Sequence, residues 1–136
     1  MSRTAEGAVL RGAVALLKLR GFPAFRMNSG AMVTPAGGLI RFGAVGMSDL
    51  VVLVPGTGRM MALELKAGRN KPTKDQLAFL ETVRTAGGVA VWLSDLAKLD
   101  AILVALRRDP AADFSVEGDP LGDDTTPRPE EAQRCR

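Results

Sequence analysis

Two β-rich runs joined by a short turn constrain the fold more than any other part of the sequence. Residues 48–54 and 59–66 are rich in Val, Leu and Met, and Pro55-Gly56-Thr57-Gly58 lies between them. Pro and Gly at these positions favour a tight turn, so we predict a β-hairpin. The run 50–54 is apolar without alternation, which is typical of strands that are buried on both faces of a sheet.

Helical and strand patterns alternate on either side of this hairpin. Apolar residues recur at helical spacing in three segments, 4–20, 73–85 and 95–108. Strand patterns occupy 22–27, 39–42 and 89–93, and a glycine-rich stretch covers 29–38. The order is helix, three to four strands, helix, strand, helix, which predicts an α/β fold with a small mixed β-sheet flanked by helices.

The amino-acid composition excludes several kinds of site. The chain has no histidine and no tyrosine, which rules out Ser-His-Asp triads, Cys-His pairs and two-histidine metal sites. Its single cysteine, Cys135, can form neither an intramolecular disulfide nor a Cys-rich zinc site. The apolar runs are far shorter than the roughly 20 residues that span a bilayer, and no signal peptide is recognisable, so we expect a cytoplasmic protein without membrane segments.

Charge divides the chain into a basic body and an acidic tail. Residues 1–108 carry 15 Lys and Arg against 7 Asp and Glu, a net charge of +8, whereas residues 109–136 carry 3 against 8, a net charge of −5. The tail has almost no apolar periodicity, so we expect one folded domain over 1–108 and a disordered tail over 109–136. A basic body suits a polyanion, and nucleic acid is the leading partner.

The hairpin brings charged residues together at the ends of apolar strands. If the turn is centred between Gly56 and Thr57, the numbers of cross-strand partners sum to 113 and Asp49 faces Glu64. Opposed carboxylates are destabilising unless something compensates them, and a divalent cation would do so. Lys66 lies two residues beyond Glu64 and therefore on the same face. The alternative is a purely structural role, in which Asp49 is a turn or strand-entry residue and Glu64 and Lys66 form a solvated strand end.

Hard oxygen ligands suit Mg²⁺ or Mn²⁺, which can activate water and neutralise phosphate charge. Asp49, followed by Glu64-Leu65-Lys66, resembles the PD-(D/E)xK nuclease signature, with Ser48 in the place of the usual proline. A wider pattern is similar to the VRR-NUC branch of that superfamily over roughly residues 4–93, through Gly46-Met47-Ser48-Asp49-Leu50, Glu64-Leu65-Lys66-Ala67-Gly68-Arg69 and Pro72-Thr73-Lys74-Asp75-Gln76.

This resemblance implies a restriction-endonuclease-like core and a DNA endonuclease that depends on Mg²⁺ or Mn²⁺. For a stand-alone domain of the phage and bacterial type, it implies branched DNA such as Holliday junctions as the substrate and a homodimer that cuts two strands. Asp49 and Glu64 would bind metal, and Lys66 would position the attacking water. The resemblance also implies Glu6 as a further metal ligand and Gln76 as a neighbour of the catalytic residues.

Two of these residues have structural alternatives. Glu6 lies in the first turn of its helix, where a negative charge complements the helix dipole. Gln76 follows Thr73 by three residues, which is the spacing of a capping box, and this role is compatible with one at the site.

The loop after Lys66 is basic, and its three cations are either DNA-binding candidates or simply a solvated loop. These cations are Arg69, Lys71 and Lys74. Two other functions remain open. One is a non-catalytic DNA-binding or assembly protein on the nuclease fold, against which the intact acidic pair and lysine argue. The other is a restriction-type endonuclease, for whose recognition elements the chain has little room.

Overall fold

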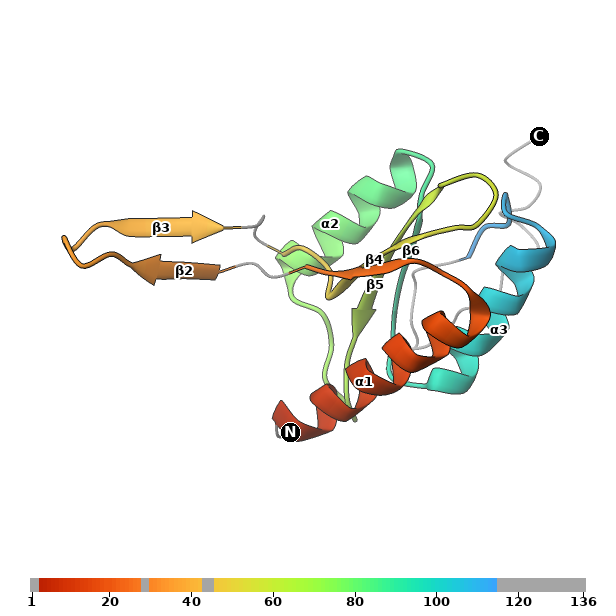
Figure 1. Ribbon diagram of the computed structural model, residues 1–136, viewed down its shortest axis with the longest axis horizontal. Coiled ribbons are helices and arrows are strands. Elements are labelled where there is room, and N and C mark those ends of the chain that lie inside the picture. Colours follow the sequence, from red (N-terminus) through yellow and green to blue (C-terminus); the bar gives the residue numbers. More distant parts are fainter. Residues whose placement is uncertain (1–2, 28–29, 43–45, 115–136) are drawn as a thin grey trace.

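The computed structural model describes residues 3–27, 30–42 and 46–114. A four-stranded mixed sheet forms the centre of the molecule, with its strands in the order β1-β4-β5-β6 (Figure 1). β1, β4 and β5 are antiparallel neighbours, and β6 runs parallel to β5. The strand bounds are β1 (Ala24–Arg26), β4 (Leu50–Leu53), β5 (Met60–Leu65) and β6 (Val89–Leu93). The predicted α/β fold with a small mixed sheet is confirmed.

The β4–β5 hairpin has the predicted register. Leu50 pairs with Leu63 and Leu53 pairs with Met60, so the numbers of partners sum to 113. The amide of Val54 donates to the carbonyl of Arg59 at 2.8 Å, which closes the turn. The next position outward from Leu50 and Leu63 is that of Asp49 and Glu64.

Three helices cover the two faces of the sheet (Figure 1). α1 (Arg3–Arg20) and α3 (Leu96–Arg108) lie on one face over the larger apolar cluster, and α2 (Lys74–Thr85) lies on the other over a smaller one. The helix ends follow from local chemistry, because Thr73 and Asp95 cap α2 and α3 through their side-chain oxygens. No helix in the described residues is long and apolar enough to cross a membrane.

A second sheet, of two strands, interrupts the predicted glycine-rich stretch. β2 (Gly30–Val33) pairs with β3 (Leu39–Phe42) in an antiparallel hairpin closed by hydrogen bonds between Thr34 and Gly38. The segment 39–42 was predicted as a strand, but β2 was not, because a Gly-containing run gains its strand character only from its cross-strand partner. β1 is also shorter than the predicted 22–27.

The packed domain continues past the predicted boundary at Arg108. Arg59 donates hydrogen bonds to the carbonyls of Pro110 and Ala112 and pairs with Asp113 at 2.7 Å. Phe114 is only 9% exposed and belongs to the larger apolar cluster. The packed part of the described chain thus extends beyond Arg108, because Arg59 and the ring of Phe114 attach residues 110–114 to the body. Residues 115–136 lie outside the described part of the chain, so the disorder expected there stays a prediction.

Candidate active site

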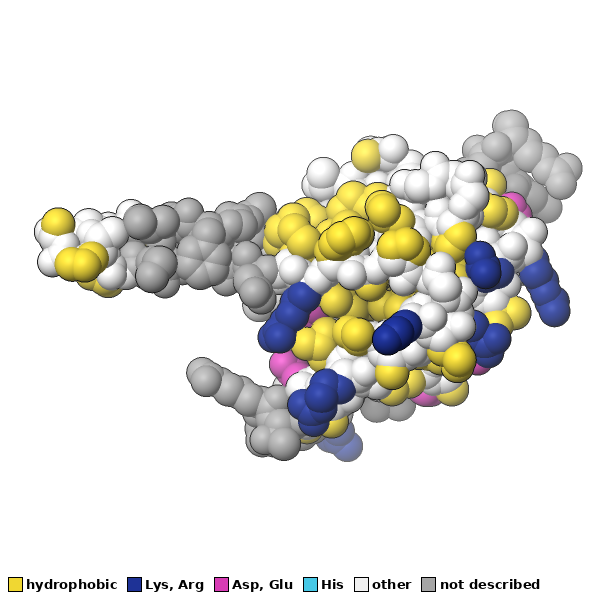
Figure 2. All heavy atoms as spheres, viewed as in Figure 1, with side chains coloured by type: hydrophobic (Ala, Val, Ile, Leu, Met, Phe, Trp, Pro, Cys, Tyr) yellow, Lys and Arg dark blue, Asp and Glu magenta, His cyan; other side chains and the backbone are white. Residues whose placement is uncertain are grey.

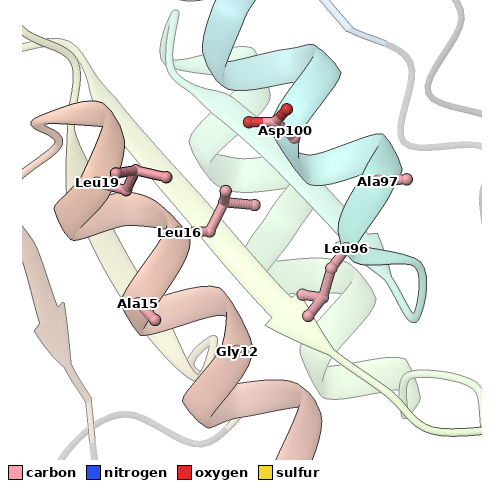
Figure 3. Close-up of a pocket in the computed structure, with 7 residues that line it drawn as sticks. All are labelled: Gly12, Ala15, Leu16, Leu19, Leu96, Ala97 and Asp100. Atoms are coloured by element: carbon pink, nitrogen blue, oxygen red, sulfur yellow. The ribbon is translucent and has the colours of Figure 1, made fainter.

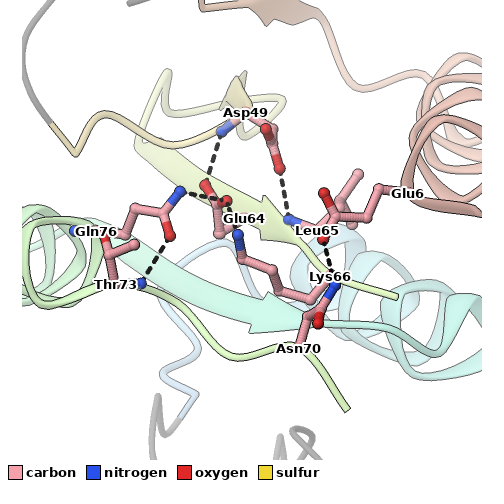
Figure 4. A network of polar contacts seen from close by, with 8 residues as sticks. All are labelled: Glu6, Asp49, Glu64, Leu65, Lys66, Asn70, Thr73 and Gln76. Carbon is pink, nitrogen blue, oxygen red and sulfur yellow. Dashed lines mark hydrogen bonds and ion pairs between the residues drawn. The ribbon is translucent and has the colours of Figure 1, made fainter. Parts of the chain in front are cut away.

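The hairpin places Asp49, Glu64 and Lys66 beside one another (Figure 4). The backbone amide of Asp49 donates to Glu64 Oε2 at 3.1 Å, and the amide of Leu65 donates to Asp49 Oδ2 at 2.8 Å. Each carboxylate is therefore held by the backbone of the opposite strand. Lys66 Nζ lies 3.2 Å from Glu64 Oε1. The predicted convergence of the three side chains is present in the structure.

Gln76 reaches the same carboxylate from α2. Its Nε2 donates to Glu64 Oε1 at 2.9 Å, while its Oε1 accepts from the Thr73 amide at 2.9 Å. The Thr73 hydroxyl accepts from the Gln76 amide, which completes the capping box. One side chain thus caps the helix and contacts the acidic pair, so the two predicted roles of Gln76 occur together.

Burial sets the electrostatics of the site. Glu64 is 1% exposed, and desolvation, followed by the nearby negative charge of Asp49, raises its pKa to about 7. The ammonium of Lys66 acts in the opposite direction. Burial and the second carboxylate outweigh these favourable contacts, so an added positive charge beside Asp49 and Glu64 would stabilise the ionised form of Glu64.

Glu6 approaches from the start of α1 but is engaged elsewhere. Its Oε1 accepts a hydrogen bond from Asn70 Nδ2 at 3.2 Å, which links α1 to the loop after Lys66 (Figure 4). Asn70 was predicted only as part of a basic loop, and no periodicity in the sequence marks it as a partner of Glu6. Within the described residues, no group of three or more Asp, Glu, Cys or His is arranged to hold a metal ion.

The donor set that remains consists of Asp49 and Glu64. Mg²⁺ is commonly bound through one or two carboxylates, with water and substrate phosphate supplying the other oxygens. Oδ2 of Asp49 and both oxygens of Glu64 accept hydrogen bonds, whereas Oδ1 of Asp49 takes no part in these contacts. This pair fits a hard divalent cation such as Mg²⁺ or Mn²⁺, and the geometry does not bring Glu6 into that pair.

No protein-family model matches the sequence, and no curated protein matches it. One solved structure, described as a VRR_NUC domain, is similar to this chain with a TM-score of 0.51 and 22% sequence identity. The similarity covers 77% of this chain and 96% of that one. The chain has the fold of a VRR_NUC domain. The resemblance predicted from the motifs is therefore confirmed at the level of the fold.

In this VRR_NUC fold, the segment before Asp49 is held by two close contacts. Gly46 has a φ of +76°, and a Cβ at this position would collide with the backbone of Asp75 in the first turn of α2. The hydroxyl of buried Ser48 donates to the carbonyl of Leu50 at 3.0 Å. Gly46 and Ser48 therefore hold the segment before β4 against the first turn of α2. Asp49 and Gln76 both contact Glu64 as a result.

Exposed cations surround this part of the VRR_NUC fold. The three predicted DNA-binding candidates are all exposed, and they follow Lys66 directly along the chain; they are Arg69, Lys71 and Lys74. Sequence reasoning missed Arg26, which is exposed at the end of β1, on the strand adjacent to the one that Asp49 precedes. Its position before Met27, whose amide donates to the Asp49 carbonyl, could have been inferred only from the β1–β4 pairing.

An apolar hollow lies between α1 and α3, away from this site (Figure 3). It is lined by Gly12, Leu16, Leu19 and Leu96, with Asp100 at its edge paired to Arg20. The hollow lies on the face of the sheet opposite to α2 and Glu64. The one charged residue of its lining, Asp100, has no second carboxylate among the other lining residues, in contrast to the pair formed by Asp49 and Glu64.

Proposed function

We propose that this protein is a DNA endonuclease that hydrolyses phosphodiester bonds with Mg²⁺ or Mn²⁺ bound by Asp49 and Glu64. One observation carries the proposal, namely the convergence of two opposed carboxylates and Lys66 on one face at the ends of buried strands. Buried strands seldom end in such a cluster without a reason, because each buried charge costs free energy unless it is paired. The VRR_NUC fold agrees with a nuclease reading.

Each residue of the site has a distinct role in the proposed hydrolysis. A bound divalent cation supplies Lewis-acid chemistry, because it polarises phosphate and lowers the pKa of water. Asp49 and Glu64 would hold it, and Gln76 holds Glu64 in place by donating a hydrogen bond to Glu64 Oε1. Lys66, with its ammonium 3.2 Å from Glu64, is placed to orient the attacking water and to offset negative charge that develops on the phosphate.

DNA suits the charge around the site. Arg69, Lys71 and Lys74 are exposed on the segment between Lys66 and the first turn of α2, where they can contact phosphates that flank the cut. We propose branched DNA as the preferred substrate, on the resemblance of the motifs to stand-alone members of the VRR-NUC branch. A junction needs two cuts, and two sites in a homodimer would supply them.

Cleavage of labelled linear, flapped and four-way-junction DNAs with Mg²⁺ or Mn²⁺ tests this function. We expect metal-dependent cutting with a preference for the branched substrates. Lys66→Ala should lower the rate by at least about 10²-fold, as expected for loss of a group that acts in the reaction. Lys18→Ala, which removes an exposed lysine from α1, is the matched control and should cut as the wild type does.

The outcomes separate the functions that the fold could serve. Cutting that survives in Lys66→Ala would contradict the proposed site. A folded wild-type protein that binds these DNAs without cutting them, in either metal, would favour a DNA-binding or assembly protein on the nuclease fold.

A further inference from the structure

A second hollow, with a basic lining, lies where α1 and α3 end. Its volume is about 300 Å³, and its lining consists of Leu19, Arg20, Val104, Arg107 and Arg108. Figure 2 shows Lys and Arg side chains on the part of the surface where these two helices end. We call this feature the arginine hollow. The candidate active site uses none of its residues.

The three arginines approach the arginine hollow from two helices. Arg20 is the last residue of α1, and its guanidinium is fixed by two hydrogen bonds to Asp100 on α3, at 2.7 and 3.0 Å. Arg107 reaches from α3 towards the end of α1, where a Cβ added to Gly21 would lie 3.4 Å from its Nη2. Arg108 follows it and is exposed. Groups of the same charge thus converge on one hollow.

Positive charge at the arginine hollow exceeds the negative charge beside it. Asp100 is paired with Arg20, whereas the side chains of Arg107 and Arg108 have no hydrogen bond or ion pair within the described residues. Asp109 is not part of the lining, and its Oδ1 accepts a hydrogen bond in the turn after α3. The ends of the two helices contribute roughly −0.5 elementary charge each, which one guanidinium offsets. About one positive charge is left uncompensated, so complementing the helix dipoles does not account for both arginines.

Phosphate is the anion that this lining fits best. A guanidinium presents parallel N–H donors that bind two phosphate oxygens at once, and its charge does not depend on pH in the physiological range. Arg107 and Arg108 are exposed at the mouth of the arginine hollow. Exposed donors suit a phosphate carried on the surface of a large molecule better than a small ligand that the protein must enclose. A phosphodiester of a DNA backbone has this character.

We propose that the arginine hollow binds a backbone phosphate of DNA at a distance from the proposed cut. Glu6 contacts the loop after Lys66, and Arg20 follows Glu6 in the same helix by 14 residues. At 1.5 Å per residue this separation is about 21 Å. It corresponds to about six base pairs of duplex at 3.4 Å each. The contact therefore holds DNA beyond the cut and takes no part in hydrolysis.

The dependence of DNA binding on salt is the first test. Fluorescence anisotropy of the full chain with duplex and four-way-junction DNA is measured in EDTA, so that no metal is present and nothing is cut. Arg107→Gln combined with Arg108→Gln removes two phosphate contacts. It should lower the slope of log Kd against log salt by about 1.8 and raise Kd at low salt by at least about tenfold.

A variant of equal charge provides the control. Arg11→Gln combined with Lys18→Gln removes two positive charges from exposed positions of α1 that do not line the arginine hollow. This variant should keep the slope of the wild type. An unchanged slope in the hollow variant, or an equal fall in both variants, would overturn the proposal.

Cleavage kinetics separate this contact from the candidate active site. The proposal rests on DNA as the partner in the proposed function, but not on cutting. The hollow variant should raise KM for DNA and keep kcat, whereas Lys66→Ala should lower kcat and keep the salt slope. A wild type that cuts no DNA while the hollow variant loses slope would refute the endonuclease and support the hollow. A hollow variant that loses kcat without a change in slope would overturn the hollow.

Tethered cross-linking provides a test that removes no charge. In a Cys135→Ser background, Leu19→Cys places a thiol at the arginine hollow, and Val14→Cys places one at another exposed position of α1. A duplex with a short disulfide tether on one backbone phosphate should react several times faster with Leu19→Cys. Unmodified DNA should suppress this reaction, and inorganic phosphate at the same phosphate concentration should not. Equal rates at the two positions, or equal suppression by inorganic phosphate, would contradict binding of a DNA phosphate.

Discussion

At the scale of a single residue, Glu64 is the side chain whose ionisation costs the fold most, although the proposed metal site needs it ionised. It is buried, it faces a second carboxylate, and it is hydrogen-bonded by Gln76 and paired with Lys66. Its pKa of about 7 means that the folded chain binds a proton that the unfolded chain releases near pH 4.5. The stability that this proton provides is fully present below about pH 4.5 and is lost as the pH rises through 7.

Glu64→Gln should therefore be more stable than the wild type at pH 8 in the absence of divalent cations. We expect its free energy of unfolding to be higher by about 1–3 kcal/mol, and this difference to shrink towards pH 4.5. Urea denaturation at a series of pH values measures the effect. Glu81→Gln, at an exposed position on α2, is the control and should leave the pH profile unchanged. A gain of the same size at every pH would show that ionisation of Glu64 is not its cause.

A divalent cation should offset the repulsion between the carboxylates of Asp49 and Glu64. At a concentration tenfold above its Kd, Mg²⁺ or Mn²⁺ would raise the free energy of unfolding of the wild type by about 1.4 kcal/mol. Asp49→Asn should lose this gain, because the variant keeps the shape of the side chain but not its charge. Thermal denaturation with and without the cation tests this. Equal stabilisation of both proteins would place the cation elsewhere on the chain.

At the scale of elements, the first turn of α2 connects folding to the site. Thr73 and Gln76 cap the helix reciprocally, and Gln76 also bonds Glu64. The same turn receives Gly46, whose missing side chain lets the segment before β4 approach the backbone of Asp75. The position of this helix end therefore decides how the acidic pair is held.

Two substitutions separate the cap from the site. Thr73→Ala should cost about 1 kcal/mol of stability, because it removes the side chain that caps the helix. It should leave cleavage largely intact, since the bond from Gln76 to Glu64 remains. Gln76→Ala should lower stability similarly and also lower the cleavage rate. Denaturation and cleavage are measured on both variants, and an equal loss of activity in the two would assign Gln76 to the cap alone.

Elements with their own periodicity were the ones that the sequence predicted well. α1, α2, α3 and β6 lie within two residues of the predicted bounds, because amphipathic spacing and caps are local signals. The hairpin register also followed from local turn chemistry. β2 was missed and β1 was placed too long, since both are short and owe their extent to neighbouring strands. Asn70 and Arg26 were missed as neighbours of the site because only the folded chain brings them there.

At the scale of the whole molecule, the packed part of the described chain continues past α3 to Phe114. Arg59, near the β4–β5 turn, donates to the carbonyls of Pro110 and Ala112, and Phe114 joins the larger cluster. A chain that ends at Arg108 should lose about 2–4 kcal/mol of stability relative to one that ends at Phe114, mostly from the lost aromatic packing. Urea denaturation of the two truncated chains checks this, and equal midpoints would contradict the role of the segment.

The acidic residues after Phe114 belong to a separate prediction. Residues 115–136 carry a net negative charge opposite to that of the body, so they should compete with DNA for its basic surface at low salt. Removing them while keeping Phe114 should tighten DNA binding at low ionic strength and have little effect at high ionic strength. Fluorescence anisotropy over a salt series measures this, and an unchanged affinity at low salt would refute the competition.

The sequence by itself determined the α/β class, the three helices and the convergence of Asp49, Glu64 and Lys66. These follow from short-range rules, because periodicity, caps and the turn of one hairpin fix which residues share a face. Only the tertiary structure decided that Glu6 bonds Asn70, that Arg59 holds residues 110–114, and that the β2–β3 hairpin packs against no other described helix or strand. Those features join residues far apart in the chain, and no local pattern reports which distant surfaces meet or which remain without a partner.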